Sequence, residues 1–238
     1  MPDVLPSDNA HYKTQQYWDS RYQTEGPDAT FDWFKSYDDI RPVLEANLPP
    51  PAPSSPPPHP GALPHLLVLG CGNSTLSESL ALVSGYTHVT SVDYSAVVVE
   101  AMRARTAKLG LDADRFTFQV ADIRDMALFA AESFAGAIDK GTMDALLTGD
   151  GEDGAGGKAY DPWNPPRELC AEVERYVREV HRVLCSRGVF IYITFGQPHF
   201  RRRHLELTTT DGVPLWESIK VQTVGDAFHY YVYVCTKT

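Results

Sequence analysis

The sequence predicts a doubly wound α/β fold in which a seven-stranded, mostly parallel sheet ends in a C-terminal antiparallel hairpin. Three observations lead to this fold class. Apolar strand-like runs alternate with helical runs from residue 65 onward, and a glycine-rich turn follows the first of these strands. The last two strands are separated by a short connection instead of a helix, whereas a second dinucleotide-binding half would continue with parallel βαβ units.

Length and charge restrict the organisation and the partners of the chain. Its 238 residues, 43% of them hydrophobic, are enough for one sizeable core. We therefore expect one domain over residues 1–238, with N-terminal helices in 1–48, a proline-rich insertion in 49–64 and an α/β core in 65–238. The formal net charge of -10 argues against broad binding to a phosphate backbone, so no nucleic-acid partner is expected.

The cysteines and the apolar runs indicate a cytoplasmic protein. Cys71, Cys170, Cys185 and Cys235 form no CxxC pair and have no metal-ligand spacing, so we expect reduced thiols and no metal. The N-terminus lacks the apolar segment of a secretory signal, and no apolar run is long enough to cross a bilayer.

The N-terminal elements come first in chain order. HYKTQQYWDSRY, His11 to Tyr22, predicts a helix that carries an aromatic cluster. A second helix is predicted over Ser36–Leu48, where Asp38 and Asp39 favour the first turn. The proline run from Pro49 to Pro64 predicts an extended surface connection.

The core elements follow in βαβ order, and the first strand is apolar throughout, as a strand buried on both faces requires. Five strands are predicted over His65–Gly70, His88–Asp93, Arg115–Ala121, Phe134–Asp139 and Gly188–Phe195. Helices are predicted over Thr75–Ser84, Ala96–Leu109 and Pro166–Leu184. An acidic glycine-rich loop is predicted at Gly149–Gly157, and the hairpin at Trp216–Val224 and Phe228–Thr236 is joined by Gly225-Asp226-Ala227.

A ligand site is indicated at the ends of three successive strands. Gly70 and Gly72 in VLGCGNSTLS allow a sharp turn and a close approach of backbone to a ligand, although the spacing is GxGxxT and lacks the third glycine of dinucleotide binding. Asp93 ends the second strand, where a carboxylate can accept ribose hydroxyls, and Asp122 ends the third. The alternatives are a tight turn without a ligand and a helix N-cap at Asp93.

This order of motifs resembles the class I S-adenosylmethionine methyltransferases from His65 to the C-terminus. The resemblance narrows at IDKGTMDALL (Ile138–Leu147), YWDSRY (Tyr17–Tyr22) and FDWF (Phe31–Phe34). These segments are similar to those of the methyltransferase-like family that includes the elongation factor 1-alpha lysine methyltransferases and the domain associated with endothelin-converting enzyme. The proline insertion and the Gly149–Gly157 loop depart from the family pattern.

The resemblance implies S-adenosyl-L-methionine as cofactor and S-adenosyl-L-homocysteine as product. It implies that Gly70 lies against the amino-acid part, that Asp93 holds the ribose, and that Tyr94, Asp122 and Ile123 surround the adenine. Lys140 would lie near the methionine carboxylate or at the rim of the transfer site. Trp18, Tyr22 and Trp33 would come from an N-terminal segment that folds over the cofactor. The alternatives are simple core packing for the aromatics and an exposed side chain for Lys140.

The acceptor implied by the resemblance is a lysine of a protein such as elongation factor 1-alpha. Its amine must lose a proton, and candidates for orienting it or taking the proton are Asp139, Asp144, Tyr192 and His199, with Lys140 beside them. The run Arg201–Arg203 predicts an exposed loop, or a contact to an acidic protein surface. A small-molecule methyltransferase, a nucleotide-cofactor oxidoreductase and a non-catalytic binding module remain alternatives at this point.

Overall fold

The computed structural model describes residues 6, 9–51, 64–148, 161, 163–225 and 228–238. The helical elements are η1 (Asn9–Lys13, a 3-10 helix), α1 (Gln15–Glu25), α2 (Tyr37–Asn47), α3 (Leu76–Leu82), α4 (Ala96–Lys108), α5 (Thr142–Leu146), α6 (Arg167–Val183) and α7 (Pro198–Leu205). The strands are β1 (His65–Leu69), β2 (His88–Asp93), β3 (Phe116–Val120), β4 (Phe134–Lys140), β5 (Leu184–Thr194), β6 (Trp216–Val224) and β7 (Tyr230–Lys237).

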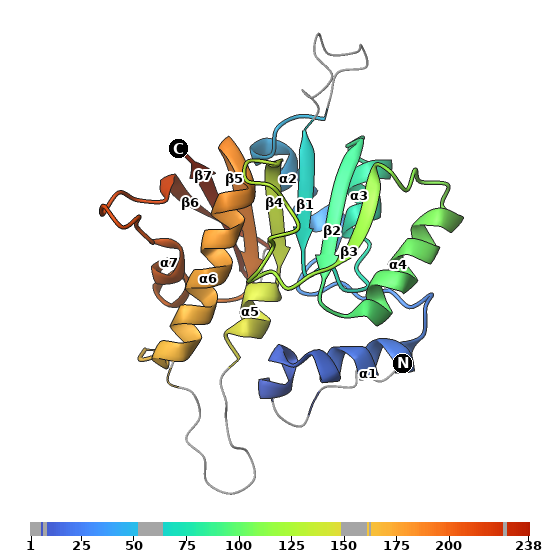
Figure 1. Ribbon diagram of the computed structural model, residues 1–238, viewed down its shortest axis with the longest axis horizontal. Coiled ribbons are helices and arrows are strands. Elements are labelled where there is room, and N and C mark those ends of the chain that lie inside the picture. The colour runs from blue at the N-terminus through green and yellow to red at the C-terminus, as the bar shows by residue number, and fades with distance from the viewer. Residues whose placement is uncertain (1–5, 7–8, 52–63, 149–160, 162, 226–227) are drawn as a thin grey trace, which may run out of the picture.

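All seven strands belong to one sheet with the order β3-β2-β1-β4-β5-β7-β6 (Figure 1). The first five are parallel to one another, and β7 pairs antiparallel with both β5 and β6. This arrangement confirms the predicted fold class. The carboxyl ends of the parallel strands therefore share one edge of the sheet, and Figure 1 shows α1 and α5 at that edge.

Helices cover both faces of the sheet because side chains alternate along the central strands. In β1, Leu66 and Val68 join the cluster that includes side chains of α2, α3 and α4. Leu67 and Leu69 face the opposite way and join the cluster of α5, α6 and α7. Burial on both faces explains why β1 is apolar at every position after His65.

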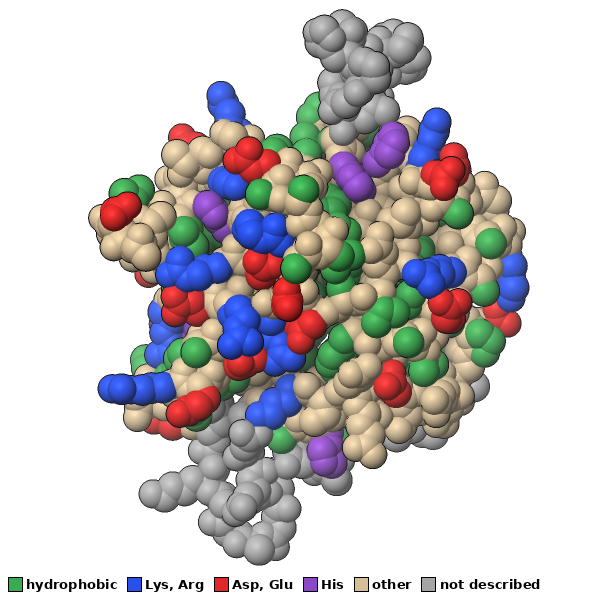
Figure 2. All heavy atoms as spheres, viewed as in Figure 1, with side chains coloured by type: hydrophobic (Ala, Val, Ile, Leu, Met, Phe, Trp, Pro, Cys, Tyr) green, Lys and Arg blue, Asp and Glu red, His purple; other side chains and the backbone are tan. Residues whose placement is uncertain are grey.

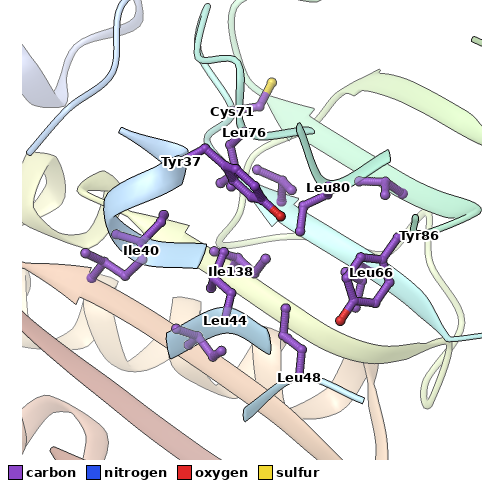
Figure 3. Close-up of a cluster of buried hydrophobic side chains, with 14 of the residues drawn as sticks. Tyr37, Ile40, Leu44, Leu48, Leu66, Cys71, Leu76, Leu80, Tyr86 and Ile138 are labelled. Carbon is purple, nitrogen blue, oxygen red and sulfur yellow. The ribbon is translucent and has the colours of Figure 1, made fainter. Parts of the chain in front are cut away.

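Helix α2 combines a capping box at its N-terminus with an apolar face that packs on the sheet. Ser36 and Asp39 form a capping box, in which each residue's side chain accepts a hydrogen bond from the other's backbone N–H. Figure 3 shows Ile40, Leu44 and Leu48 directed toward Leu66 and Ile138 of the sheet. A Cβ at Gly136 of β4 would lie 2.8 Å from Leu48 Cδ2, so a larger residue there would require Leu48 to shift.

Three segments differ from the sequence prediction. The helix predicted over His11–Tyr22 is interrupted at Thr14, so that η1 and α1 are separate elements. The Thr14 backbone is extended, and its hydroxyl donates a hydrogen bond to His11 O at 2.8 Å. Helix α1 then continues beyond the predicted end, to Glu25. Short helix α5 was not predicted. The Arg201–Arg203 run lies in α7, which begins with Pro198 in its first turn, so the prediction of a loop there was wrong.

Several predicted features fall outside the described residues, namely the Gly149–Gly157 loop, most of the proline run and residues 226–227. Within the described part, all four cysteines are free thiols and no cluster of metal-ligating side chains is found. No helix in the described ranges is long and apolar enough to cross a membrane. Figure 2 shows acidic and basic side chains interspersed over the face that carries α6.

Candidate active site

A cavity of about 250 Å³ lies at the carboxyl ends of β1, β2 and β4, under the N-terminal segment. Ligands of open α/β sheets bind at this edge. The cavity brings together every residue predicted to bind the cofactor, among them the catalytic candidate Lys140, and also the catalytic candidate Asp144: Trp18, Tyr22, Trp33, Gly70, Gly72, Asp93, Tyr94, Asp122, Ile123, Lys140 and Asp144.

The glycine-rich turn after β1 is closely packed on two sides. Gly70 and Gly72 have φ values of 59° and 51°, in the left-handed region that favours glycine. A Cβ at Gly70 would lie 2.3 Å from Thr142 Oγ1, and one at Gly72 would lie 2.9 Å from the Tyr22 hydroxyl. Thr142 itself donates to Leu69 O at 2.9 Å, so the start of α5 and the turn hold each other in place. The turn is thus a rigid backbone wall of the cavity.

Asp93 is the buried acid at the end of β2. Its carboxylate accepts the backbone N–H groups of Gly72 and Ser95, both at 2.9 Å, and the residue is only 5% exposed. Burial raises the pKa of Asp93 to about 6, although these two hydrogen bonds favour the ionised form. A buried carboxylate that faces a cavity and has remaining acceptor capacity fits a ligand with hydroxyl donors.

Asp122, just after the end of β3, is held by Arg124, a partner that no sequence motif indicated. The Arg124 guanidinium donates to Asp122 Oδ2 at 2.7 Å and also pairs with Glu172 of α6. These contacts to Arg124 lower the pKa of Asp122 in spite of its partial burial. Arg124 lines the cavity beside Asp122 and Ile123, so this end of the cavity presents a fixed ion pair together with apolar surface.

The aromatic side chains of YWDSRY and FDWF form a cover over the turn. The rings of Trp18 and Tyr22 stack at 5.7 Å, and Trp33 meets Trp18 edge-on at 6.1 Å. The guanidinium carbon of Arg21, a residue that was not predicted to belong to the site, lies 4.8 Å from the Phe31 ring centroid. These rings therefore line the cavity with apolar surface and also pack on one another as part of the core.

Helix α1 is anchored directly to the Asp93 region. Gln15 Nε2 donates to Tyr94 O at 2.8 Å, and the Ser95 hydroxyl donates to Asp19 of α1. Ser95 is also the N-cap of α4. The cover and the residues beyond β2 are therefore one hydrogen-bonded unit.

Lys140 joins the cover to the end of β4. Its ammonium donates to Asp32 Oδ1 at 2.9 Å and to Trp33 O at 3.0 Å, and its side chain is 5% exposed. Burial lowers the pKa of Lys140, while the Asp32 charge opposes that change. Asp32 also accepts the hydroxyls of Ser74 and Thr75 at 2.5 and 3.1 Å. We call these four residues, Asp32, Ser74, Thr75 and Lys140, the Asp32 latch.

We expect Asp32→Ala to speed dissociation of a bound cofactor about tenfold, since the loss of one charge-assisted hydrogen bond is worth ~1.5 kcal/mol. The latch connects the cover to both walls of the cavity, and its loss lets the cover open more often. Stopped-flow tryptophan fluorescence measures the rate. Asp28→Ala is the matched control, because Asp28 pairs with Lys108 on the exposed surface. Equal rates for the two variants would contradict this role.

Three catalytic candidates do not reach the cavity wall among the described residues: Asp139, His199 and Tyr192, which instead contacts Asp144. Asp139 is fully buried and accepts the N–H groups of Thr142 and Met143 at 2.7 and 2.9 Å and the Tyr176 hydroxyl at 2.7 Å. Burial raises the pKa of Asp139 to about 7. His199 lies in α7, where it stacks on Trp163 at 5.1 Å.

Asp144 of α5 does line the cavity, and three side chains hold it: the buried Tyr192 and Thr194 and the largely buried Arg201. Tyr192 and Thr194 of β5 donate to its two carboxylate oxygens at 2.9 and 2.6 Å, and Arg201 donates to Oδ1 at 2.9 Å. Burial raises the pKa of Tyr192 well above its usual value, and the Asp144 charge adds to the effect. A Cβ at Gly196 would lie 2.3 Å from Arg201 Nε, so glycine makes room for the guanidinium. The Arg201 side chain is thus largely buried, with 12% of its surface exposed.

Comparison with known proteins places these features in a family. Residues 65–224 match the protein family described as "Methyltransferase domain". EEF1A lysine methyltransferase 4 of Bos taurus is 38% identical over 233 residues, which cover 98% of this chain and 79% of the relative. The eEF1A lysine and N-terminal methyltransferase of Bos taurus is 30% identical over 201 residues, 84% of this chain and 24% of the relative.

Among solved structures, geranyl diphosphate C-methyltransferase from Streptomyces coelicolor A3(2) has a TM-score of 0.57 over 98% of this chain and 100% of that one. That structure contains S-adenosyl-L-homocysteine. The sequence identity is 14%, so this likeness bears on the fold alone.

The fold, the glycine turn and the acid at the end of β2 define an S-adenosylmethionine-dependent methyltransferase. The chain belongs to the methyltransferase family that includes EEF1A lysine methyltransferase 4, as the similarity over nearly its whole length shows. This membership confirms the resemblance inferred from IDKGTMDALL, YWDSRY and FDWF. When bound, the cofactor supplies a methyl group activated by its attachment to a sulfonium.

Proposed function

We propose that this enzyme transfers methyl groups to a lysine of elongation factor 1-alpha in the cytoplasm. The observation that carries the proposal is the 36–38% identity to two proteins named EEF1A lysine methyltransferase 4 over 98–99% of the chain. Such identity includes the N-terminal cover as well as the α/β core. The location follows from the acceptor, because a translation factor acts where proteins are synthesised.

In the proposed arrangement the chain orients the donor with its own rigid groups. Asp93 accepts the ribose hydroxyls, and Gly70 and Gly72 let the backbone approach the amino-acid part. Tyr94, Asp122 and Ile123 surround the adenine, with Arg124 fixing the Asp122 carboxylate. The rings of Trp18, Tyr22 and Trp33 keep water away from the transferred methyl group.

Lys140 and Asp139 act as positioning residues in this proposal. The Lys140 ammonium is occupied by Asp32 and the Trp33 carbonyl, so it holds the cover in place. Asp139 fixes the start of α5 through two backbone N–H groups, and thereby places Asp144. His199 carries no step of the proposed reaction.

Asp144 is the proposed contact for the acceptor amine. Its Oδ1 accepts from both Thr194 and Arg201, whereas Oδ2 accepts only from Tyr192 among the hydrogen bonds of the described residues, so Oδ2 has room for one more donor. A lysine amine has a free pKa of about 10.4 and must be neutral to attack. Desolvation between aromatic walls favours the neutral amine, and Asp144 orients it.

The test is methyl transfer from labelled S-adenosylmethionine to purified elongation factor 1-alpha, with the modified residue mapped by mass spectrometry. We expect label on one lysine, and none when that lysine is replaced by arginine or when the enzyme carries Asp144→Ala. Labelling of small molecules without labelling of any protein would refute the proposed acceptor. The Asp38→Ala variant, altered at an exposed acid of α2, controls for the loss of a carboxylate.

A further inference from the structure

Four aromatic side chains form a continuous series that begins in the cavity and continues onto the surface. The Phe195 ring lies 5.4 Å from Phe34, Phe34 lies 5.6 Å from Tyr230, and Tyr230 lies 5.4 Å from Phe228, measured between ring centroids. Phe34 and Phe195 both line the cavity. We call these four residues the aromatic row.

Both ends of the row are unusually exposed for phenylalanine side chains. Phe195 is 50% exposed and Phe228 is 66% exposed. Single exposed apolar residues are common and need no explanation, whereas contiguous apolar surface beside a ligand site marks an interaction surface. Aromatic residues contribute much of the binding energy of such surfaces.

The backbone and the neighbouring residues hold Phe34 of this row in a fixed position. Phe34 has φ 66°, a left-handed conformation that costs a non-glycine residue roughly 1–2 kcal/mol. The preceding residues are held by the Asp32 latch, and a Cβ at Gly141 would lie 3.0 Å from the Phe34 ring, so glycine makes room for it. Lys35, the residue after Phe34, places its Nζ 5.3 Å from the Tyr230 ring centroid, a cation–π contact that holds Tyr230 beside Phe34.

The row lies on the side of the cavity away from Asp93. Phe195 follows the end of β5, and Thr194 pairs with Tyr231 at the start of β7. In the sheet order β5 is three positions from β2, and with strands about 4.8 Å apart the two strand ends are separated by roughly 14 Å. Asp144, which accepts a hydrogen bond from Thr194 of β5, lies on the same side of the cavity as the aromatic row.

We propose that the aromatic row is the docking surface for the protein acceptor and that it receives an apolar side chain close to the acceptor lysine. The proposal rests on the proposed function, because the occupant is the protein whose lysine enters the cavity beside Phe34 and Phe195. Continuity between the row and the cavity supports this occupant: an acceptor that reaches Asp144 from this side passes over the row.

The experiment measures binding and methylation of purified elongation factor 1-alpha by the wild type and by Phe228→Ala. We expect KM for the protein acceptor to rise about tenfold, consistent with the loss of one aromatic anchor, while kcat and the affinity for S-adenosylmethionine change less than twofold. Phe228→Tyr should restore KM, since it keeps the ring. Val213→Ala, at another exposed apolar residue, should leave all three quantities unchanged.

Each outcome separates this proposal from the one on which it rests. If the wild type methylates the factor and Phe228→Ala keeps the same KM, the docking proposal is refuted and the proposed function stands. If the wild type neither binds nor methylates the factor, both are refuted. A change in oligomeric state by light scattering, with KM unaltered, would assign the row to a second copy of this chain and overturn the proposal.

Discussion

Asp93→Ala is expected to weaken S-adenosylmethionine binding about 100-fold. The carboxylate is buried at the end of β2, and the cofactor's ribose offers two hydroxyl donors to it. Two charge-assisted hydrogen bonds worth ~1.5 kcal/mol each amount to a factor of roughly 100 in the dissociation constant. Isothermal titration calorimetry measures the change, and Asp38→Ala, with an exposed carboxylate removed, should bind like the wild type.

The pH dependence of the same titration identifies the group. Burial raises the pKa of Asp93 to about 6 in the free protein, and the ionised form is the one that accepts the hydroxyls. Affinity is therefore full above pH 7 and falls as the pH drops through 6, approaching tenfold per pH unit at lower pH. The dependence should disappear in Asp93→Asn. A wild-type affinity that is constant from pH 5 to 7 would show that Asp93 does not hold the cofactor.

The predicted cofactor-binding residues that line the cavity share one property: each belongs to a short local motif at the end of a strand or in an aromatic cluster. Gly70, Asp93 and Asp122 lie at or just after the carboxyl ends of three parallel strands, and parallel pairing brings strand ends to one edge of the sheet whatever the details of packing. The alternation of apolar strand-like runs with helical runs was enough to predict the parallel sheet, and the short connection between the last two strands was enough to predict the C-terminal hairpin. Topology therefore made part of the site predictable.

The partners of these residues were not predictable, because they are distant in sequence. Lys140 and Asp32 are 108 residues apart, and Arg201 and Asp144 are 57 apart. No local pattern marks such pairs. The run Arg201–Arg203 resembles a solvated segment in composition, yet α7 turns its first arginine inward toward Gly196. Helix α5 is five residues long, and its start depends on the Asp139 carboxylate and on contact with the glycine turn.

Arg201→Met is expected to destabilise the protein by about 3 kcal/mol, because it leaves the Asp144 carboxylate buried without its cation. The two side chains are 12% and 7% exposed, and the bond between them is 2.9 Å. At about 2–4 °C per kcal/mol for a domain of this size, the melting temperature should fall by roughly 10 °C. Urea unfolding gives the free energy directly.

The adjacent arginine provides a matched control. Arg202 makes the same kind of ion pair with Glu206, but both side chains are 51% exposed, and exposed pairs contribute at most about 1 kcal/mol. Arg202→Met should therefore change stability little. The double variant Arg201→Met with Asp144→Asn should be more stable than Arg201→Met alone, because the uncompensated charge is gone. The double variant should nevertheless be inactive, since Asp144 is the proposed contact for the acceptor amine. If Arg201→Met were no more destabilising than Arg202→Met, the buried pair would not be what holds Asp144 at the cavity wall.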